Sequence, residues 1–483
     1  MVDLLVIGGG INGAGIARDA AGRGLSVLLA ERGDLAGATS SSSSKLIHGG
    51  LRYLEHYEFR LVAEALAERE ILLGVAAHLV WPASFVMPHV PALRPRWMIR
   101  TGLFLYDHLS RRASLPGSHA VRLDSPPYNS GLKPELKHGF IYSDCRVDDA
   151  RLVVANAMDA RNRGARVLTH TEVLSGKREN SVWKIALSSG EEVQAKAVVN
   201  AAGPWVKGVL NGTLGQPSAD AVRLVRGSHI VLPKLYEGDH AFILQNDDRR
   251  VIFMIPYGDL HTLVGTTDIS QEEISASLPS DEEILYLCKA ISRYLARPAK
   301  PQDVVWKYAG VRPLYDDGSA DPSAVTRDYT LRVDDDQGAM PVLSVFGGKI
   351  TTYRRLAEQV LAHLAPYLPG LQGAWTARSP LPGSDFGGRA RVEARDAFFA
   401  RFPRIPEALK RPIFRRHGAS SDAVVGEGDL GEDYGAGLTE REVRYFVEHE
   451  WAKSAEDVLW RRTKAGLLMS AAQRERVARA MGT

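Results

Sequence analysis

The most restrictive feature of the sequence is a glycine pattern close to its start. Leu4–Ile7 is a short apolar run of the kind that a buried parallel strand needs, and Gly8, Gly10 and Gly13 follow it with the spacing G-x-G-x-x-G. The first glycine permits a tight turn, the second lets the backbone approach a pyrophosphate, and the third allows a helix to pack closely on the strand. The pattern predicts a Rossmann-like strand, turn and helix around a dinucleotide.

The segment after the glycines supports this prediction. A helix is expected over residues 12–23, with the amide groups around Ile11 and Asn12 directed at the phosphates. A second strand is expected over residues 25–30, and Glu31 ends it. An acid about 20 residues beyond the glycines accepts hydrogen bonds from an adenosine ribose and repels a 2′-phosphate, so an NADP-type ligand is disfavoured. This pattern alone does not separate FAD from NAD.

The bulk properties limit the classes of protein to which the chain can belong. Its 483 residues are too many for one compact core and fit two or three domains. Hydrophobic residues make up 45% and charged residues 24%, as in ordinary soluble globular proteins. The formal net charge is only +3, so we expect no nucleic-acid partner.

The cysteines and the lengths of the apolar runs indicate in which cellular compartment the protein works. Cys145 and Cys288 lie far apart and lack a CxxC or metal-ligand spacing, which favours a reducing cytoplasmic environment. The N-terminus has no basic region followed by a cleavage site, and no apolar run approaches the roughly 18 residues that span a bilayer. We therefore expect a protein that is neither exported nor transmembrane.

Further stretches resemble the FAD-dependent glycerol-3-phosphate dehydrogenase family, within the wider glycine- and D-amino-acid-oxidase-like flavoproteins. They cover nearly the whole chain, in order. They are "ERGDLAGATSSSSSKLIHGGLRY" from Glu31, "VVNAAGPWV" (198–206), "RGSHIVLP" (226–233), "VGTTD" (264–268), "YAGVRPL" (308–314), "FGGKITTYR" (346–354) and "DLGEDYGAGLTEREVRYFVEHEWAKSAEDVLWRRT" near the C-terminus. The resemblance implies FAD as cofactor, sn-glycerol 3-phosphate as substrate, ubiquinone as electron acceptor and a homodimer.

Two of these stretches fit a flavin site on physical grounds. "VVNAAGPW" is a buried strand ending in small residues, which suits a close approach to a cofactor by Ala201, Ala202, Gly203 and Trp205. In "FGGKITTYR" a helix is expected to start after the glycines, with Thr351 and Thr352 in its first turn. A helix N-terminus and Lys349 near the flavin pyrimidine ring would stabilise negative charge on the reduced flavin.

The serine run Ser40–Ser44 admits two interpretations. Such a run usually forms a flexible tether. Here it continues into a lysine, a histidine and a glycine pair, and short hydroxyl side chains can follow a cofactor closely, so we favour a wall of the flavin site. The other residues expected at the cofactor are Arg32, Thr39, Ser40, Ser41, Ser44, Lys45, His48, Gly49, Gly50, Leu51, Val173, Gly348 and Ile350.

The resemblance also implies the reaction, which needs cations for a phosphate dianion. Arg52 and Arg312 are the main candidates because guanidinium groups bind phosphate oxygens bidentately; structural ion pairs are the alternative. Tyr53 adds a hydroxyl contact and Lys349 a further cation. The glycerol end is assigned to Thr266, Thr267 and Asp268, with a turn cap as the alternative.

The reaction also needs a base for the C2 hydroxyl group as its hydride passes to flavin N5. His48 and His229 are the candidates, because histidine titrates close to operating pH. A structural histidine is an equal alternative at each position. No metal is expected: "DDDQG" (334–338) is interpreted as a turn between strands, since Val345 stands where a calcium loop needs glutamate.

The expected fold class is α/β with three regions. A discontinuous Rossmann-like FAD-binding domain is assigned to residues 1–85, 145–215 and 325–375. An antiparallel substrate-binding or cap region takes 86–144 and 216–324, with a helix over 281–296. Residues 376–483 are expected to be mainly helical, with Thr439 and Ser454 as N-caps.

The segment "RPRWMIRTGLFLYDHLSRR" (94–112) joins a basic rim to apolar residues. It predicts either a helix in the membrane interface or a buried helix on the C-terminal domain. The first interpretation implies peripheral attachment to the cytoplasmic face of the inner membrane. The competing functions are a soluble oxidase that reduces oxygen, an amine or amino-acid oxidase, and an RNA-binding flavoprotein.

Overall fold

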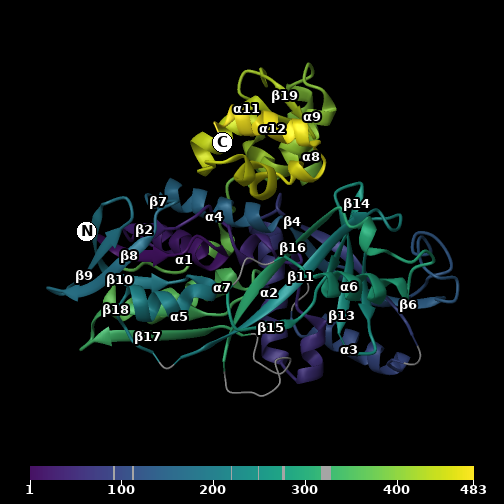
Figure 1. Ribbon diagram of the computed structural model, residues 1–483, viewed down its shortest axis with the longest axis horizontal. Helices are drawn as coiled ribbons and strands as arrows, with labels where there is room; N and C mark the ends of the chain where they lie inside the picture. The colour runs from purple at the N-terminus through teal and green to yellow at the C-terminus, as the bar shows by residue number, and fades with distance from the viewer. Residues whose placement is uncertain are drawn as a thin grey trace.

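The computed structural model describes residues 1–90, 93–110, 114–218, 220–248, 250–274, 278–316 and 328–482. Arg111 and Arg112 of the expected basic rim, and residues 325–327 of the expected FAD-binding domain, lie outside these ranges. Figure 1 shows a broad two-sheet body with the C-terminal domain, coloured yellow, standing on one side of it.

The N-terminal residues form the parallel sheet that the glycine pattern predicts. β1 (Val2–Ile7) pairs in parallel with β2 (Val27–Ala30) and with β10 (Glu192–Asn200). The full strand order is β17-β18-β10-β1-β2-β7, with a hairpin of β8 and β9 beside β10. The remaining bounds are β7 (Arg166–Leu168), β8 (Val173–Glu179), β9 (Val182–Leu187), β17 (Thr330–Asp336) and β18 (Ala339–Phe346). This confirms the α/β fold class.

Three helices cover this sheet with small and branched apolar side chains. α1 (Ile11–Gly22) packs between α4 (Asp149–Asn162) and α7 (Tyr353–Leu364), and their buried faces join one core. The expected start of α7 was wrong. The helix begins at Tyr353, because Thr351 and Thr352 lie in the turn before it.

A second, mainly antiparallel sheet forms the other half of the body. Its order is β15-β11-β14-β13-β12-β4-β6-β3, with β16 paired to β11 and β5 paired to β6. The strands are β3 (Leu46–Ile47), β4 (Val80–Pro88), β5 (His119–Arg122), β6 (His138–Val147), β11 (Val222–Pro233), β12 (Ala241–Gln245), β13 (Val251–Tyr257), β14 (His261–Gly265), β15 (Ile269–Gln271) and β16 (Trp306–Tyr315). Segment 1–85 thus contributes β3 and most of β4 to this sheet, and the expected boundary at residue 85 falls inside β4.

Three helices accompany the second sheet, α2 (Phe59–Val75), α3 (Arg96–His108) and α6 (Asp281–Ser292). Ser280 and Glu283 form a capping box at the start of α6, so the expected helix begins as the sequence indicates and ends four residues before the expected 296. α3 buries Ile99, Leu103 and Tyr106 in the core of this region. Figure 1 places α3 on the side of the body away from the C-terminal domain, so the alternative of a helix packed on that domain was wrong.

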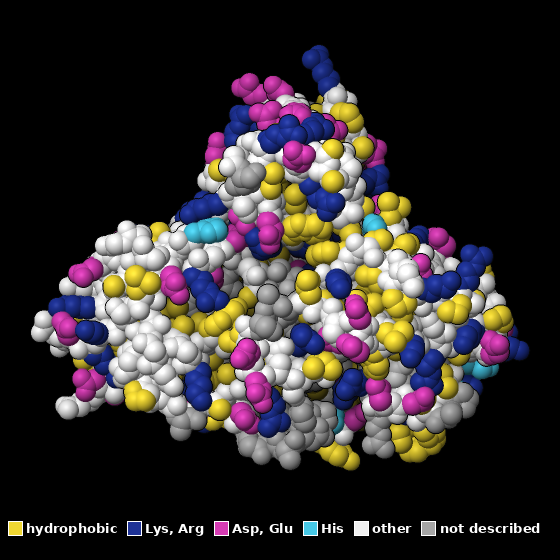
Figure 2. Space-filling view, in the orientation of Figure 1, with side chains coloured by type: hydrophobic (Ala, Val, Ile, Leu, Met, Phe, Trp, Pro, Cys, Tyr) yellow, Lys and Arg dark blue, Asp and Glu magenta, His cyan; other side chains and the backbone are white. Residues whose placement is uncertain are grey.

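The C-terminal domain is helical, as expected. It contains α8 (Arg391–Arg401), α9 (Glu407–His417), α10 (Ser421–Val425), α11 (Glu440–Glu450) and α12 (Ala471–Ala480), and the small pair β19 (Asp433–Gly435) and β20 (Leu438–Thr439). Ser454 accepts a hydrogen bond from the Asp457 amide, as a cap should. Thr439 holds the N-cap position of α11 without a side-chain cap, because it is also the end of β20. On the face that Figure 2 shows, acidic and basic side chains are interleaved over this domain.

Short helical turns connect these elements. They are η1 (Thr39–Ser41), η2 (Leu51–His56), η3 (Gly203–Trp205), α5 (Val206–Gly208), η4 (Val209–Thr213), η5 (Pro301–Asp303), η6 (Ala365–Tyr367), η7 (Thr376–Arg378), η8 (Gly418–Ser420), η9 (Asp457–Arg462) and η10 (Ala465–Leu467). The turn expected over residues 334–338 is shorter: Asp334–Asp336 end β17, and Gln337 and Gly338 form the turn to β18.

Three further features of the described residues bear on the sequence predictions. Cys145 and Cys288 are both buried and free. Within the described ranges, no group of three or more His, Cys, Asp or Glu side chains is arranged to hold a metal ion. None of the helices in those ranges combines the length and apolar character that crossing a membrane requires.

Candidate active site

A cavity of about 640 Å³ lies between the two sheets. One wall comes from the carboxyl ends of β1, β2 and β10, through Ile7, Ala30 and Ala201. The other comes from β11 and β16, through His229 and Arg312. Its volume is in the range of about 300–1,000 Å³ that cofactor and ligand sites occupy. Open α/β sheets bind ligands at the carboxyl ends of their strands, which is where this cavity begins.

The glycine pattern shapes one end of the cavity. Gly8 has φ +109°, and a Cβ atom there would lie 2.6 Å from the Ala201 carbonyl oxygen. A Cβ atom on Gly13 would lie 1.9 Å from the Gly8 carbonyl oxygen. No side chain fits at either position, so the roles expected for the first and third glycines agree with the geometry. Ser40 completes the turn by accepting a hydrogen bond from the Ile11 amide at 3.0 Å.

Glu31 occupies the end of β2, beside the glycines. One carboxylate oxygen accepts from the Gly9 amide at 2.6 Å and the other from the Gly33 amide at 2.8 Å. Arg32 stacks on the Trp205 ring, 4.0 Å from its centroid, and both side chains lie on the cavity wall. These groups form a rigid frame at the end where the motif predicts the adenosine ribose.

The serine run crosses between the sheets and does not form a tether. Ser43 donates to the Asp149 carboxylate at 2.7 Å, Ser44 bonds the His229 ring at 2.8 Å, and Thr39 donates to the Val311 carbonyl at 2.6 Å. Each partner is more than 100 residues away in the sequence. The run therefore ties both sheets to the cavity that they enclose.

Lys45 lies in a different setting from the one expected. Its side chain is buried, and its Nζ atom contacts both Asp149 carboxylate oxygens, at 2.9 and 2.8 Å, and the Ser41 carbonyl at 2.9 Å. Burial opposes ionisation of Asp149, but the charges of Lys45 and Lys464, together with hydrogen bonds from Lys45 and Ser43, hold the pKa of that carboxyl below its usual value. Lys45 is therefore a structural cation behind the cavity wall.

The wall contains most of the residues expected at the cofactor. These are Gly8, Gly10, Ile11, Asn12, Glu31, Arg32, Thr39, Ser40, Ser44, His48, Val173, Ala201, Ala202, Gly203, Trp205, Gly348, Lys349, Ile350 and Thr351. Gly13, Ser41, Lys45, Gly49, Gly50, Leu51 and Thr352 are not part of it. The Gly49 amide donates to the Tyr106 hydroxyl at 2.9 Å, away from the cavity.

The expected substrate residues form an arginine pair around one carboxylate. Arg312 pairs with Asp268 and donates to the Thr266 hydroxyl at 3.2 Å. Arg52 approaches the same carboxylate at 3.9 Å. Arg312 and Thr266 lie on the wall, whereas Arg52 and Asp268 are outside it. Asp268 thus orients guanidinium groups, a role that sequence reasoning did not assign to it.

Thr267 was expected near the glycerol end of the substrate, but its side chain is buried. Its hydroxyl donates to Glu283 at 2.7 Å and accepts from the Ser228 amide at 3.0 Å. The prediction for Thr267 is therefore corrected, because alternation along the chain turns it into the core next to Thr266.

Lys349 carries an ammonium group that lacks a hydrogen-bond acceptor among the described residues. Its Nζ atom is buried and lies 3.8 Å from the centroid of the Tyr53 ring. Both residues line the cavity. Buried charges in proteins are normally paired. An ammonium group without an acceptor on a cavity wall therefore indicates an anionic or electron-rich ligand.

Both candidate bases reach the cavity. His229 stacks on Tyr308, with ring centroids 4.9 Å apart, and its Nδ1 atom is buried without a partner among the described residues. Burial, helped by the charges of Arg312 and Lys45, lowers the pKa of His229 to about 3. His229 is therefore neutral at physiological pH. The His48 amide donates to the Thr351 hydroxyl at 3.3 Å, and its ring lies edge-on to Phe253.

Several wall residues escaped sequence reasoning. Gly227 makes room for Arg312, because a Cβ atom there would lie 2.3 Å from the guanidinium group. Arg461 and Glu456 come from the C-terminal domain. Their segment, "SAEDVLWRRT", has an ordinary amphipathic pattern, so no local signal identified them.

Comparison with known proteins identifies the family. Residues 3–354 match the FAD-dependent oxidoreductase family, and residues 374–483 match the C-terminal domain of alpha-glycerophosphate oxidase. The chain belongs to the FAD-dependent oxidoreductases. The residues present fit this cofactor: the cavity has a glycine turn suited to a pyrophosphate, Glu31 suited to an adenosine ribose, and at Lys349 an ammonium group without a hydrogen-bond acceptor in the described part of the chain.

Relatives of this oxidoreductase are similar over almost their full length. It is 51% identical to the aerobic glycerol-3-phosphate dehydrogenase of Escherichia coli, over 98% of this chain and 96% of that protein. It is 52% identical to the glycerol-3-phosphate dehydrogenase of Pseudomonas aeruginosa, over 98% and 94%. The D-erythritol 1-phosphate dehydrogenase of Brucella abortus is 48% identical, over 98% and 96%.

A solved structure shares the fold. The glycerol-3-phosphate dehydrogenase from Bacillus halodurans, complexed with FAD, superposes with a TM-score of 0.74 at 26% identity, covering 100% of this chain and 94% of the other. The predicted resemblance to the FAD-dependent glycerol-3-phosphate dehydrogenases is therefore confirmed.

Proposed function

We propose that the protein oxidises sn-glycerol 3-phosphate to dihydroxyacetone phosphate. The observation that carries the proposal is that Arg312 and Lys349, whose ammonium group has no hydrogen-bond acceptor among the described residues, converge on the cavity that also contains the dinucleotide cradle. A phosphorylated alcohol needs cations beside a redox cofactor, and this cavity supplies both. The names of the most similar relatives support the same substrate class.

In this proposal the arginines hold the phosphate dianion. Arg312 is fixed by Asp268 and Thr266, so little side-chain freedom is lost when it binds phosphate oxygens. Arg52 approaches Asp268 from the other side and adds a second positive charge nearby. Lys349, stacked on Tyr53, neutralises negative charge that develops during the reaction.

The alcohol proton needs an acceptor in the same cavity. FAD, when bound, supplies N5 as the acceptor of the C2 hydride. We assign the proton to His48, because the low pKa of His229, about 3, makes it a weak base. His229, held by Ser44 and Tyr308, then acts as a neutral hydrogen-bonding group. In this assignment, the rate of hydride transfer rises with pH as the base loses its proton. His48→Asn should abolish this rise, whereas His229→Asn should lower the rate and leave the rise in place.

Anaerobic titration of the FAD-loaded protein tests the substrate. We expect sn-glycerol 3-phosphate to bleach the flavin absorbance. D-erythritol 1-phosphate is the necessary comparison because one close relative is named for it. More efficient bleaching by that compound would reassign the substrate within the same class. Bleaching by glycine or sarcosine alone would point to an amine or amino-acid oxidase and overturn the proposal.

The electron acceptor in the proposal is ubiquinone. The alternative on the same scaffold is a soluble oxidase that reduces oxygen to peroxide. Turnover of sn-glycerol 3-phosphate with a short-chain ubiquinone, at a rate well above that with oxygen, is the expected result. Peroxide formation that matches substrate consumption without quinone would favour the oxidase.

α3 supplies a surface for the peripheral membrane attachment that we include in the proposal, at the cytoplasmic face of the inner membrane. Trp97 is 67% exposed and Phe104 57% exposed, while the basic residues Arg96 and Arg100 flank them. Tyr57, 81% exposed, is the C-cap residue of η2, which contacts α3. Apolar rings with basic neighbours suit the headgroup region of a bilayer.

Sedimentation with vesicles tests this attachment. Binding to vesicles that contain anionic lipid should weaken as salt rises, and Trp97→Ser with Phe104→Ser should abolish it. Failure of the unmodified protein to bind such vesicles at low salt would contradict the attachment.

The homodimer that the family resemblance implies belongs to the same proposal, and analytical ultracentrifugation measures it.

A further inference from the structure

The loop that follows Glu31 is held from outside its own domain. The Asp34 side chain in this loop is only 3% exposed. Arg462 donates two hydrogen bonds to its carboxylate, at 2.8 and 2.7 Å. Arg461 donates another through Nε, at 2.5 Å. Both arginines belong to η9 of the C-terminal domain, 427 and 428 positions further along the chain.

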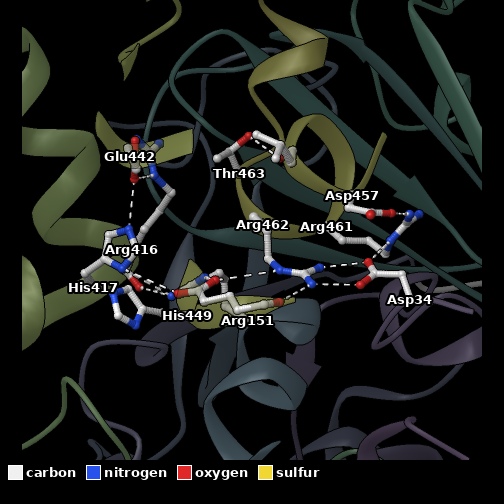
Figure 3. Close-up of polar contacts among 12 residues, drawn as sticks. Asp34, Arg151, Arg416, His417, Glu442, His449, Asp457, Arg461, Arg462 and Thr463 are labelled. Carbon is white, nitrogen blue, oxygen red and sulfur yellow. Dashed lines mark hydrogen bonds and ion pairs between the residues drawn. The ribbon is translucent and has the colours of Figure 1, made fainter. Parts of the chain in front are cut away.

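Arg462 is fixed in turn by a buried chain of polar contacts, which Figure 3 shows running from Glu442 to Asp34. It donates to the Glu450 carbonyl at 2.6 Å, and the Glu450 carboxylate pairs with Arg151 of α4. Arg151 donates to the Arg416 carbonyl at 3.2 Å, and Arg416 pairs with Glu442. The Arg462 guanidinium group is therefore held on the side away from Asp34, and that of Arg461 pairs with Asp457.

The same loop forms the adenosine end of the cavity. Gly33, directly before Asp34, donates its amide to Glu31, and the Ala36 amide donates to the Gly9 carbonyl at 3.1 Å. Asp34 and Arg461 both contribute to the cavity wall. A displacement of Asp34 would therefore move the amide that fixes Glu31, and with it the group that faces the ribose.

We propose that Arg461 and Arg462 are positioning residues for FAD, and that the C-terminal domain holds the adenosine end of the cofactor site in its binding conformation through Asp34. A loop that is already fixed loses less conformational freedom on binding, so the affinity for the cofactor is higher. The inference concerns binding of the cofactor and not of the substrate proposed above. A different substrate would therefore leave it unchanged.

The test measures flavin affinity of the full-length apoprotein by quenching of flavin fluorescence. Asp34→Asn removes the charge that both arginines hold. We expect it to raise the dissociation constant for FAD roughly 10- to 100-fold, the range found when outer partners of a bound metal are removed. The affinity for FMN, which lacks the adenosine half, should remain unchanged. Arg461→Gln should shift FAD affinity in the same direction, and Arg461→Lys should recover part of it.

Asp159→Asn is the matched control. Asp159 is also a buried aspartate of the FAD-binding domain with two arginine partners, Arg18 at 2.6 Å and Arg163 at 3.2 Å, but it lies on α4 and is absent from the cavity wall. Its variant should lose stability without a comparable loss of FAD affinity. Thermal unfolding of each apoprotein measures that structural loss separately.

Three results would overturn the inference. FAD affinity could be the same in Asp34→Asn as in the unmodified protein. FMN affinity could fall as much as FAD affinity, which would indicate general loosening. Asp159→Asn could weaken FAD binding to the same extent. If Asp34→Asn does not fold, Arg461→Gln decides, because it leaves the Asp34–Arg462 pair in place, and unchanged FAD affinity in that variant would count against the inference.

Discussion

Lys349 is the residue at which loss of one group should have the largest effect on the proposed reaction. Its ammonium group is buried on the cavity wall without an acceptor among the described residues. Lys349→Met should lower kcat by about 100- to 1,000-fold, as removal of one preorganised charge-stabilising donor does. Steady-state turnover of sn-glycerol 3-phosphate measures it, with Lys184→Met, a surface lysine paired with Glu179, as the control. An effect no larger than that of the control would contradict the assigned role.

Gly227 should be intolerant of even one added methyl group. A Cβ atom would lie 2.3 Å from the Arg312 guanidinium, which must then move. Gly227→Ala should lower kcat/KM roughly 100-fold, the size of effect that a displacement of about 1 Å produces, while FAD still binds. Gly212→Ala, where nothing lies within 4 Å, should be neutral. Equal kinetics for the two variants would show that Arg312 has room to adjust.

Sequence reasoning succeeded at residues whose role is set by nearby neighbours. The glycines at 8 and 13 are required by backbone atoms that the local turn itself brings close. It failed at Lys45, Asp268 and Thr267, because their partners come from distant segments. Lys45 meets Asp149, 104 positions away, and no pattern around either residue indicates the pair.

Helix starts offer a test at the scale of single elements. Ser280 caps α6 by accepting the Glu283 amide at 3.3 Å, whereas Thr439 at the start of α11 makes no cap, and its hydroxyl is buried without a partner among the described residues. Ser280→Ala should lower the free energy of unfolding by about 1 kcal/mol. Thr439→Val should be neutral or stabilising, since a methyl group replaces an unpaired hydroxyl. Chemical denaturation of both variants checks the contrast, and equal losses would refute it.

Element types were predicted better than element ends. The strand and helix around the glycines follow from strong apolar patterns, and the helix expected over 281–296 is present as α6. The start of α7 was predicted too early. Thr351 and Thr352 are good first-turn residues, but contacts at the cavity determine where they lie. The His48 amide donates to the Thr351 hydroxyl, which holds that turn outside the helix.

At the scale of the whole molecule, buried histidines should make stability sensitive to acid. Burial lowers the pKa of His78, of His417, of His240 to about 4 and of His229 to about 3. The unfolded chain binds protons near pH 6.5 and the folded apoprotein does not, so stability falls as the pH drops from about 6.5 towards 3.

For His229 alone, this loss is about 2 kcal/mol at pH 5. Urea unfolding of the apoprotein between pH 8 and pH 5 measures the total, and His240→Asn should reduce the slope. A free energy of unfolding that stays constant over this range would contradict the pKa directions.

The position of the C-terminal domain was beyond sequence reasoning. Its helices were predicted, but its contact with the cofactor cavity depends on ion pairs between residues more than 400 positions apart, such as Asp34 and Arg462. Such pairs leave no periodicity or motif, and both partners have ordinary local surroundings.

The spread of the cavity wall along the chain has a consequence for biosynthesis. The wall begins with Ile7 and its last contribution is Arg461. While the protein is being made, the glycine turn leaves the ribosome first, long before the groups that close the adenosine end. A nascent chain therefore has the glycine turn before it has Glu456 and Arg461, and we expect its affinity for FAD to reach the full value only once the C-terminal domain has been made. A chain that ends before the C-terminal domain should therefore bind FAD more weakly than the full-length chain does.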